Sequence, residues 1–115
     1  MKRVFSIVAL VAMIFNLCAC GSKRMDGISD RAYDYGLAAL ETADEFINGD
    51  LDADAASDKL ERTLILVDRC DGENDSLVSS SIFLLQVAID NKGDGTGTMA
   101  TVEERRDDLA DKLGK

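Results

Sequence analysis

From residue 28 onwards, apolar residues recur every three or four positions, which is the spacing of an α-helix with one buried face. In the first such segment they are Ala32, Tyr33, Gly36, Leu40, Ala43 and Ile47. In the second they are Ala56, Leu60, Leu64 and Val67. This pattern predicts helices over about 30–48 and 53–69. The connection Gly49-Asp50-Leu51 is short and polar, so the two helices should pack antiparallel as a hairpin.

A third helix is predicted over about 76–90. It contains an apolar run from Ile82 to Ile89, interrupted only by Gln86. We interpret it as a helix that is apolar on most sides and therefore central in the fold. Residues 91–97 are rich in glycine and predict a mobile loop. A fourth helix is predicted over about 99–113, with an apolar face of Val102, Leu109 and Leu113. The expected fold is all-α, an antiparallel bundle of about four helices.

The first twenty residues follow a different pattern. Lys2 and Arg3 precede an apolar stretch from Val4 to Leu17, and the chain turns polar after Cys20. A basic start, a short apolar stretch and a small residue before the cut are typical of a secretory signal peptide. The alternative is an uncleaved membrane anchor, since a spanning helix needs ~17–25 apolar residues. Both interpretations place the rest of the chain outside the cytoplasm.

The sequence Leu17-Cys18-Ala19-Cys20 resembles the lipobox of bacterial lipoproteins, which has the form Leu-x-(Ala/Gly)-Cys. The resemblance implies cleavage before Cys20 and a covalent diacylglyceryl group on its sulfur, with acyl chains such as palmitate. Residues 1–19 are then a lipoprotein signal peptide, residues 20–27 a lipidated tether, and residues 28–115 the helical domain. The expected location is the extracytoplasmic face of the cell membrane, with the lipid anchor as membrane contact and no other cofactor.

A second resemblance concerns the predicted hairpin. Its pattern is similar to one found in short uncharacterised helical lipoproteins of Gram-positive bacteria. The matching residues are Ala39-Leu40-Glu41, Asp44-Glu45-Phe46, Gly49, and Asp52-Ala53-Asp54 through Leu60-Glu61. This resemblance implies a helical hairpin and brings no known activity.

Charge and composition narrow the classes of function. The chain has 13 basic and 22 acidic residues and a net charge of −9, and loss of Lys2 and Arg3 with the signal would leave 11 basic residues. We expect no nucleic-acid partner, because phosphate binding needs clustered Lys and Arg. The acidic surface suits a cationic partner, either a metal ion or a basic protein. The chain has no His, which excludes Ser-His and Cys-His catalytic pairs, and we expect no enzyme activity.

Five acidic residues are candidate calcium ligands. They stand at positions 1, 3, 5, 9 and 12 of a loop of the EF-hand type: Asp50, Asp52, Asp54, Asp58 and Glu61. Position 6, where the sharp turn calls for glycine, is Ala55. The same stretch also fits a helix start with Asp52 as N-cap. A loop and a helix cannot both occupy residues 53–57, and we favour the helix, with no metal bound.

Two further features have the residue types of a site. Asp90 and Asp94 stand at positions 1 and 5 of a second loop of the calcium-binding type, but Lys92 and Thr101 replace two of the carboxylates it needs. Cys70 follows Arg69 but lies between Asp68 and Asp71, so it lacks the net positive surroundings of a reactive thiolate. We expect a structural or incidental role, with intermolecular pairing as the alternative.

The sequence therefore predicts a membrane-anchored, extracytoplasmic helical lipoprotein that acts as a binding or structural module with an unidentified ligand. One alternative is a calcium-dependent module that uses the segment from Asp50 to Glu61. Another is a carboxylate-based hydrolase, because two acidic residues suffice for glycoside hydrolysis. No pair of acidic residues stands out for that chemistry.

Overall fold

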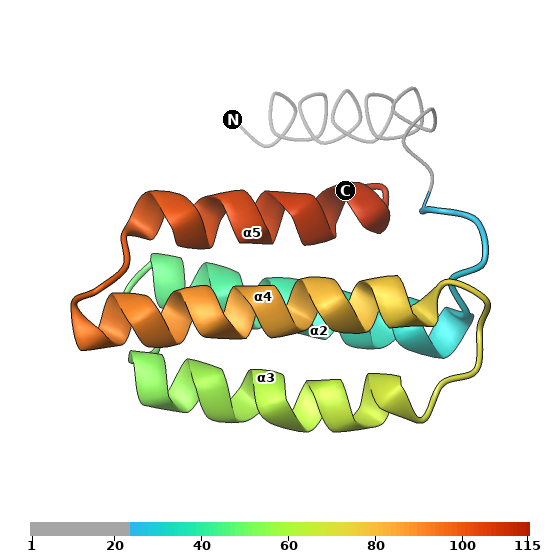
Figure 1. Cartoon of the computed structure of the whole chain (residues 1–115), viewed down its shortest axis with the longest axis horizontal. Coiled ribbons are helices and arrows are strands. Elements are labelled where there is room, and N and C mark those ends of the chain that lie inside the picture. Colours follow the sequence, from blue (N-terminus) through green and yellow to red (C-terminus); the bar gives the residue numbers. More distant parts are fainter. Residues whose placement is uncertain (1–23) are drawn as a thin grey trace, which may run out of the picture.

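The computed structural model describes residues 24–115 and folds them into a bundle of four α-helices. The helices are α2 (Asp30–Ile47), α3 (Ala53–Asp68), α4 (Asp75–Asp94) and α5 (Met99–Lys112). Consecutive helices run antiparallel (Figure 1), which confirms the predicted all-α fold. The predicted signal peptide, residues 1–19, and the lipidation site Cys20 lie outside the described residues. No helix in the described range is long and apolar enough to cross a membrane.

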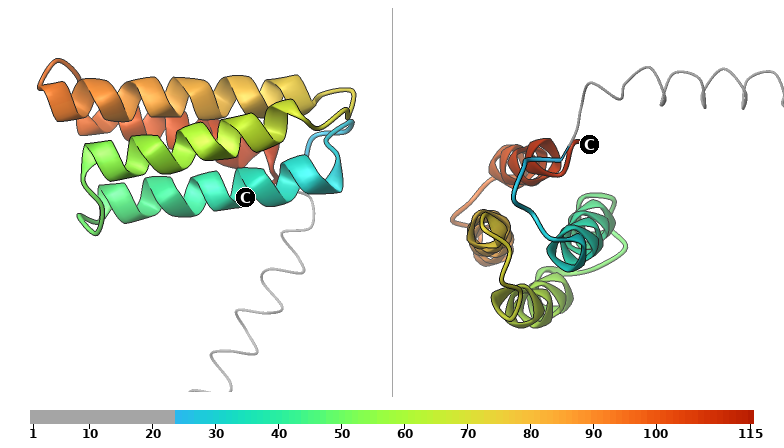
Figure 2. Two further views of the ribbon diagram at one scale, coloured as in Figure 1. Left: turned by 90° about the horizontal axis from the view of Figure 1, so that it is seen from below. Right: turned by 90° about the vertical axis from the view of Figure 1, so that its right-hand side faces the viewer.

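The four helices occupy the corners of a square in the order α2, α3, α4, α5 (Figure 2). α2 and α4 touch each other across the square as well as both of their neighbours. α3 and α5 make no contact with each other within residues 24–115. The shorter diagonal of the bundle therefore runs between α2 and α4.

All four helices contribute apolar side chains to one core. The largest fully buried ones are Leu60, Val67, Val78, Ile82, Leu85, Ile89, Val102, Leu109 and Leu113. α2 presents small residues to this core, with Ala32, Ala39 and Ala43 fully buried. A Cβ atom on Gly36 of the same helix would lie 2.8 Å from Cδ1 of Leu113. Small residues on α2 thus let the larger side chains of the other helices approach its backbone.

Local signals correctly predicted the hairpin between α2 and α3. Gly49 has a φ of 85° just beyond the end of α2, the left-handed conformation that glycine adopts without steric cost. Asp52 is the N-cap of α3, and its side chain accepts a hydrogen bond from the backbone N–H of Ala55 at 2.8 Å. The segment 53–57 is therefore helical, as favoured from the sequence.

The prediction for the third helix ended too early. α4 begins at Asp75 and continues through Gly93 to Asp94, so most of the expected mobile loop is helical. The helix ends at Gly95, which has a φ of 82°. A Cβ atom on Gly93 would lie 2.5 Å from Cβ of Ala53. Close packing of α4 against the start of α3 thus outweighs the low helix propensity of glycine.

The interpretation of this helix as central was also wrong in one respect. α4 does contact all three other helices, but its outer side is open to solvent. Phe83, Leu84 and Val87 are 55%, 38% and 37% exposed. A square of four helices has no enclosed helix, and the apolar run 82–89 supplies both the inner and the outer side of α4.

We predict that Leu85→Asp unfolds the bundle. Leu85 is fully buried, so the substitution places an unpaired charge in the core at a cost of several kcal/mol, against a total stability of about 5–15 kcal/mol for a small domain. Circular dichroism during thermal unfolding measures the effect. Leu84→Asp, the same change at the neighbouring exposed position, should keep a cooperative transition. Similar melting of both variants would contradict the assignment of the two sides of α4.

Candidate functional site

The most buried charged group in the described residues is the carboxylate of Asp75, which is 2% exposed. One carboxylate oxygen accepts a hydrogen bond from the Ser29 backbone N–H at 2.8 Å. The other accepts from the Ser29 hydroxyl and from the Gly72 backbone N–H, both at 2.7 Å. Ser29 is the N-cap of α2, and its hydroxyl also accepts from the Ala32 N–H at 3.2 Å. Asp75 thus joins the start of α2 to the start of α4.

Neighbouring contacts extend this junction. The Asn74 side chain donates to the carbonyl of Asp26 at 2.6 Å, and the Asn74 backbone N–H donates to the carbonyl of Gly27 at 2.9 Å. Burial of Asp75 by itself would raise the pKa of its carboxyl group. The hydrogen bonds from Ser29 and Gly72 stabilise the charged form more strongly, so the pKa lies below its ordinary value. We assign a structural role to this carboxylate, since protein groups occupy both of its oxygens.

A second polar cluster lies between α4 and α5. The Lys112 ammonium donates to the Ser81 hydroxyl at 2.6 Å and to an Asp108 carboxylate oxygen at 2.8 Å. The Ser81 hydroxyl lies 3.1 Å from the same oxygen and donates to it. The hydrogen bond from Lys112 lowers the pKa of Asp108, with partial burial acting against it and Ser81 adding to it.

Serine beside lysine is a combination that some enzymes use for nucleophilic catalysis. Here Ser81 is only 2% exposed, and its hydroxyl is bonded to both Lys112 and Asp108. A hydroxyl closed off in this way offers no nucleophile to a substrate in solution. The cluster connects α4 to α5.

A third contact links α5 to α2. The Arg106 guanidinium donates to both carboxylate oxygens of Asp44, at 2.9 and 3.2 Å. The hydrogen bond that Arg106 donates to Asp44 raises the pKa of Arg106 above its ordinary value, although partial burial opposes that shift. Two-pronged pairs of this kind fix geometry as well as adding stability. α5, which has few large apolar residues, is thereby held on both sides by charged contacts.

The structure does not bring the candidate calcium ligands together. Asp52 is occupied by the Ala55 N–H, Asp54 and Asp58 lie on the exposed side of α3, and Glu61 is a further turn along the helix. Asp90 and Asp94 of the second candidate loop are both inside α4. Within residues 24–115 no group of three or more acidic, Cys or His side chains is arranged to hold a metal ion.

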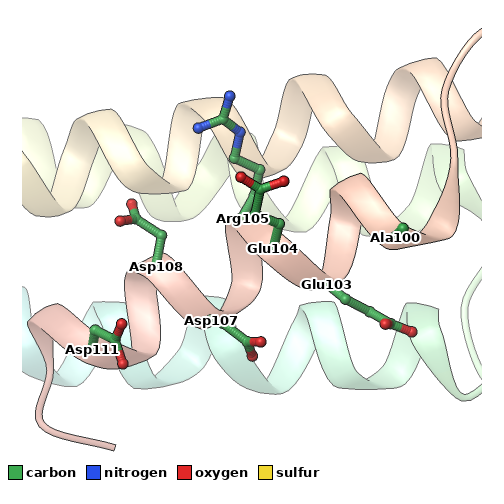
Figure 3. A pocket seen from close by; sticks show the side chains of 7 residues that line it. All are labelled: Ala100, Glu103, Glu104, Arg105, Asp107, Asp108 and Asp111. Carbon is green, nitrogen blue, oxygen red and sulfur yellow. The ribbon is translucent and has the colours of Figure 1, made fainter.

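An open hollow runs along α5 and is lined mostly by acidic residues, as Figure 3 shows. Its lining consists of Ala100, Glu103, Glu104, Arg105, Asp107, Asp108 and Asp111. The acidic side chains point in different directions from one helix (Figure 3), so they do not converge on a ligand.

Cys70 is half-buried, and its Sγ donates to the Leu66 carbonyl at 3.5 Å, a contact within one helical turn.

The sequence analysis did not predict the contacts of Asp75, Ser81 and Lys112. The contacts of these residues span 27 to 46 positions of sequence, and helical periodicity contains no information at that range.

Comparison of the chain with protein-family models, curated proteins and solved structures finds no match.

We predict that Asp52→Ala destabilises the bundle by about 0.5–2 kcal/mol, the usual loss for an N-cap, equally with and without calcium. Urea unfolding in the two conditions measures this. Calorimetric titration of the wild-type protein with Ca²⁺ at physiological salt should show no saturable site, because Asp50, Asp54 and Asp58 do not converge. A saturable site abolished by Glu61→Gln would contradict this prediction and favour the calcium-dependent alternative.

We predict that Asp75→Asn destabilises the bundle by about 1–3 kcal/mol at neutral pH, because buried N–H groups lose a charged acceptor. The lowered pKa of Asp75 in the folded state stabilises the fold at pH values above 3.8, the value in the unfolded chain. That contribution is lost as the pH falls through the folded pKa. The stability difference between variant and wild type should therefore shrink below pH 3.8 in urea titrations.

The exposed neighbour Asp71 provides the control for this experiment. Asp71→Asn should have nearly wild-type stability at every pH. A difference between Asp75→Asn and wild type that stays constant down to strongly acidic pH would show that the charge of Asp75 does not stabilise the fold.

Proposed function

We propose that this chain is a lipid-anchored, extracytoplasmic binding module, acylated at Cys20, that presents a helical bundle close to the membrane surface. The observation on which this rests is the resemblance of residues 17–20 to a lipobox, which ends four positions before the first described residue, Arg24. Such a short connection would hold the bundle near the lipid headgroups.

The beginning of the described chain supports this arrangement, because it is tied to the bundle. The Met25 backbone N–H donates to the Lys112 carbonyl at 2.7 Å, and residues 26 and 27 bond to Asn74. A lipidated tether over residues 20–27 would therefore join the bundle at the end where α2 starts and α5 finishes.

The distribution of polar groups favours binding over catalysis. Buried polar side chains of the described residues all have hydrogen-bond partners inside the protein. Thr42, for example, donates to the Ala38 carbonyl at 3.0 Å. Catalytic sites usually contain strongly perturbed groups in a cleft, whereas the shifted groups here, Asp75, Arg106 and Asp108, are engaged in joining helices. No observation favours the calcium-dependent module or the hydrolase.

We predict that cells fed a clickable fatty acid incorporate it into the wild-type chain. Cys20→Ser should abolish this label, because the sulfur that accepts the lipid is absent. Gel fluorescence after metabolic labelling measures the effect. Cys70→Ser is the matched control and should be labelled as strongly as the wild type. Equal labelling of Cys20→Ser and wild type would contradict the lipoprotein assignment.

A further inference from the structure

The turn between α2 and α3 contains an asparagine followed directly by a glycine, Asn48-Gly49. This turn lies at the end of the bundle opposite the start of α2 (Figure 1), and both residues are exposed. A Cβ atom on Gly49 would meet nothing within 4 Å among the described residues. Asparagine is one of the chemically labile residues of proteins, and a following glycine, which has no Cβ atom, leaves its backbone nitrogen unhindered.

The reaction that this pair can undergo is deamidation. The backbone nitrogen of Gly49 attacks the side-chain carbon Cγ of Asn48, and a new N–Cγ bond closes a five-membered succinimide ring. The side-chain amide nitrogen leaves as ammonia, together with the proton that the Gly49 nitrogen loses. Water then opens the ring at one of its two carbonyl carbons. Cleavage of the N–Cγ bond gives aspartate, and cleavage of the original peptide bond gives isoaspartate, in which the main chain runs through Cγ.

The other two asparagines of residues 24–115 are placed differently. Asn74 donates a side-chain hydrogen bond to the Asp26 carbonyl at 2.6 Å. Asn91 lies inside α4, three positions before the end of that helix. Each is followed by a residue with a side chain, which hinders the approach of the backbone nitrogen to Cγ. Asn48 is therefore the asparagine of this range that both sequence and structure leave reactive.

The folded turn restrains the reaction without preventing it. Asn48 has a ψ of −6° as the C-cap of α2, and the Gly49 N–H donates to the Phe46 carbonyl at 3.1 Å. This hydrogen bond must break and ψ must change before the nitrogen can reach Cγ. Opening of the end of a helix costs much less free energy than global unfolding. The rate of deamidation is therefore set by opening of the last turn of α2.

Deamidation changes both the charge and the backbone of the turn. A carboxylate at position 48 lies at the C-terminal end of α2, where the helix dipole disfavours negative charge. It follows Asp44 and Glu45 by four and three positions, the spacing at which like charges on a helix repel. Isoaspartate also lengthens the main chain by one carbon, which displaces the hydrogen bond from the Asp50 N–H to the Glu45 carbonyl, 2.8 Å in length. Both products should weaken the hairpin.

We propose that Asn48 deamidates spontaneously in the folded protein and that the products destabilise the hairpin of α2 and α3. The turn is then a site of chemical ageing, at the end of the bundle farthest from the start of α2. The reaction needs only Asn48, Gly49 and water, so it proceeds with or without a lipid on Cys20.

Incubation of the purified full-length chain at physiological temperature and mildly alkaline pH, followed by tryptic digestion and tandem mass spectrometry, measures deamidation site by site. Trypsin cleaves after Arg31 and Lys59, so Asn48 is the one asparagine of the peptide 32–59. It should deamidate several-fold faster than the other two asparagines and give both aspartate and isoaspartate, which chromatography separates. Deamidation of Asn48 that is no faster than that of the other two would overturn the proposal.

Urea distinguishes opening of the turn from unfolding of the bundle. At urea concentrations just below the unfolding transition, the rate at Asn48 should stay close to its value in buffer, because opening of one turn exposes little surface. A rate that rises in proportion to the unfolded fraction would show that Asn48 reacts only in the unfolded chain. That outcome would overturn deamidation in the folded protein.

Asn48→Gln tests the consequence for stability. Glutamine keeps a neutral amide at this exposed position, but its reaction requires a six-membered ring and is much slower. The midpoint of urea unfolding should fall on incubation of the wild type and should stay constant for Asn48→Gln. Asn91→Gln is the matched control, and its midpoint should fall as that of the wild type does. An equal fall for Asn48→Gln and wild type, or an unchanged wild type after Asn48 has reacted, would refute the destabilisation of the hairpin.

Discussion

The carboxylate of Asp75 is the interaction on which the arrangement of the helices depends. It accepts hydrogen bonds from Ser29 and Gly72, which are distant in sequence from each other, and so fixes where α2 and α4 begin relative to one another. A buried charge is tolerated only when its partners satisfy it. The junction fixes the relative position of the first turns of α2 and α4, the two helices on the shorter diagonal of the bundle. Cys70 is a free thiol, so packing and hydrogen bonds hold the described residues together.

α5 depends on the rest of the bundle in a different way. Its apolar contribution is small, with Val102, Leu109 and Leu113 as its main core residues. Charged contacts complete its attachment, through Arg106 to Asp44 on α2 and through Lys112 to Ser81 on α4. Exposed ion pairs add little stability, but these are partly buried and bonded to more than one group. They position α5, and they engage its polar groups with partners inside the protein.

α4 has two apolar sides, and this property relates the fold to the proposed function. Its inner side contains Val78, Ile82, Leu85 and Ile89, as in any bundle of this type. Packing within the bundle does not require apolar residues on its outer side. Phe83, Leu84 and Val87 nevertheless expose apolar surface to water there, which is unfavourable. Exposed apolar surfaces of this kind usually mark interaction sites.

Sequence alone determined the number of helices, most core positions and the hairpin between α2 and α3, because each depends on helical spacing or on local backbone chemistry, as at Gly49 and Asp52. It also shows a resemblance to a lipobox at residues 17–20, a linear pattern that needs no fold. Tertiary structure alone decided that Gly93 lies inside α4, that Asp75 is a buried junction and that Ser81 is closed off by Lys112. Those outcomes depend on contacts between residues far apart in the chain. An apolar run such as 82–89 has the same sequence whether its sides face a core or water, and only the positions of the neighbouring helices distinguish the two.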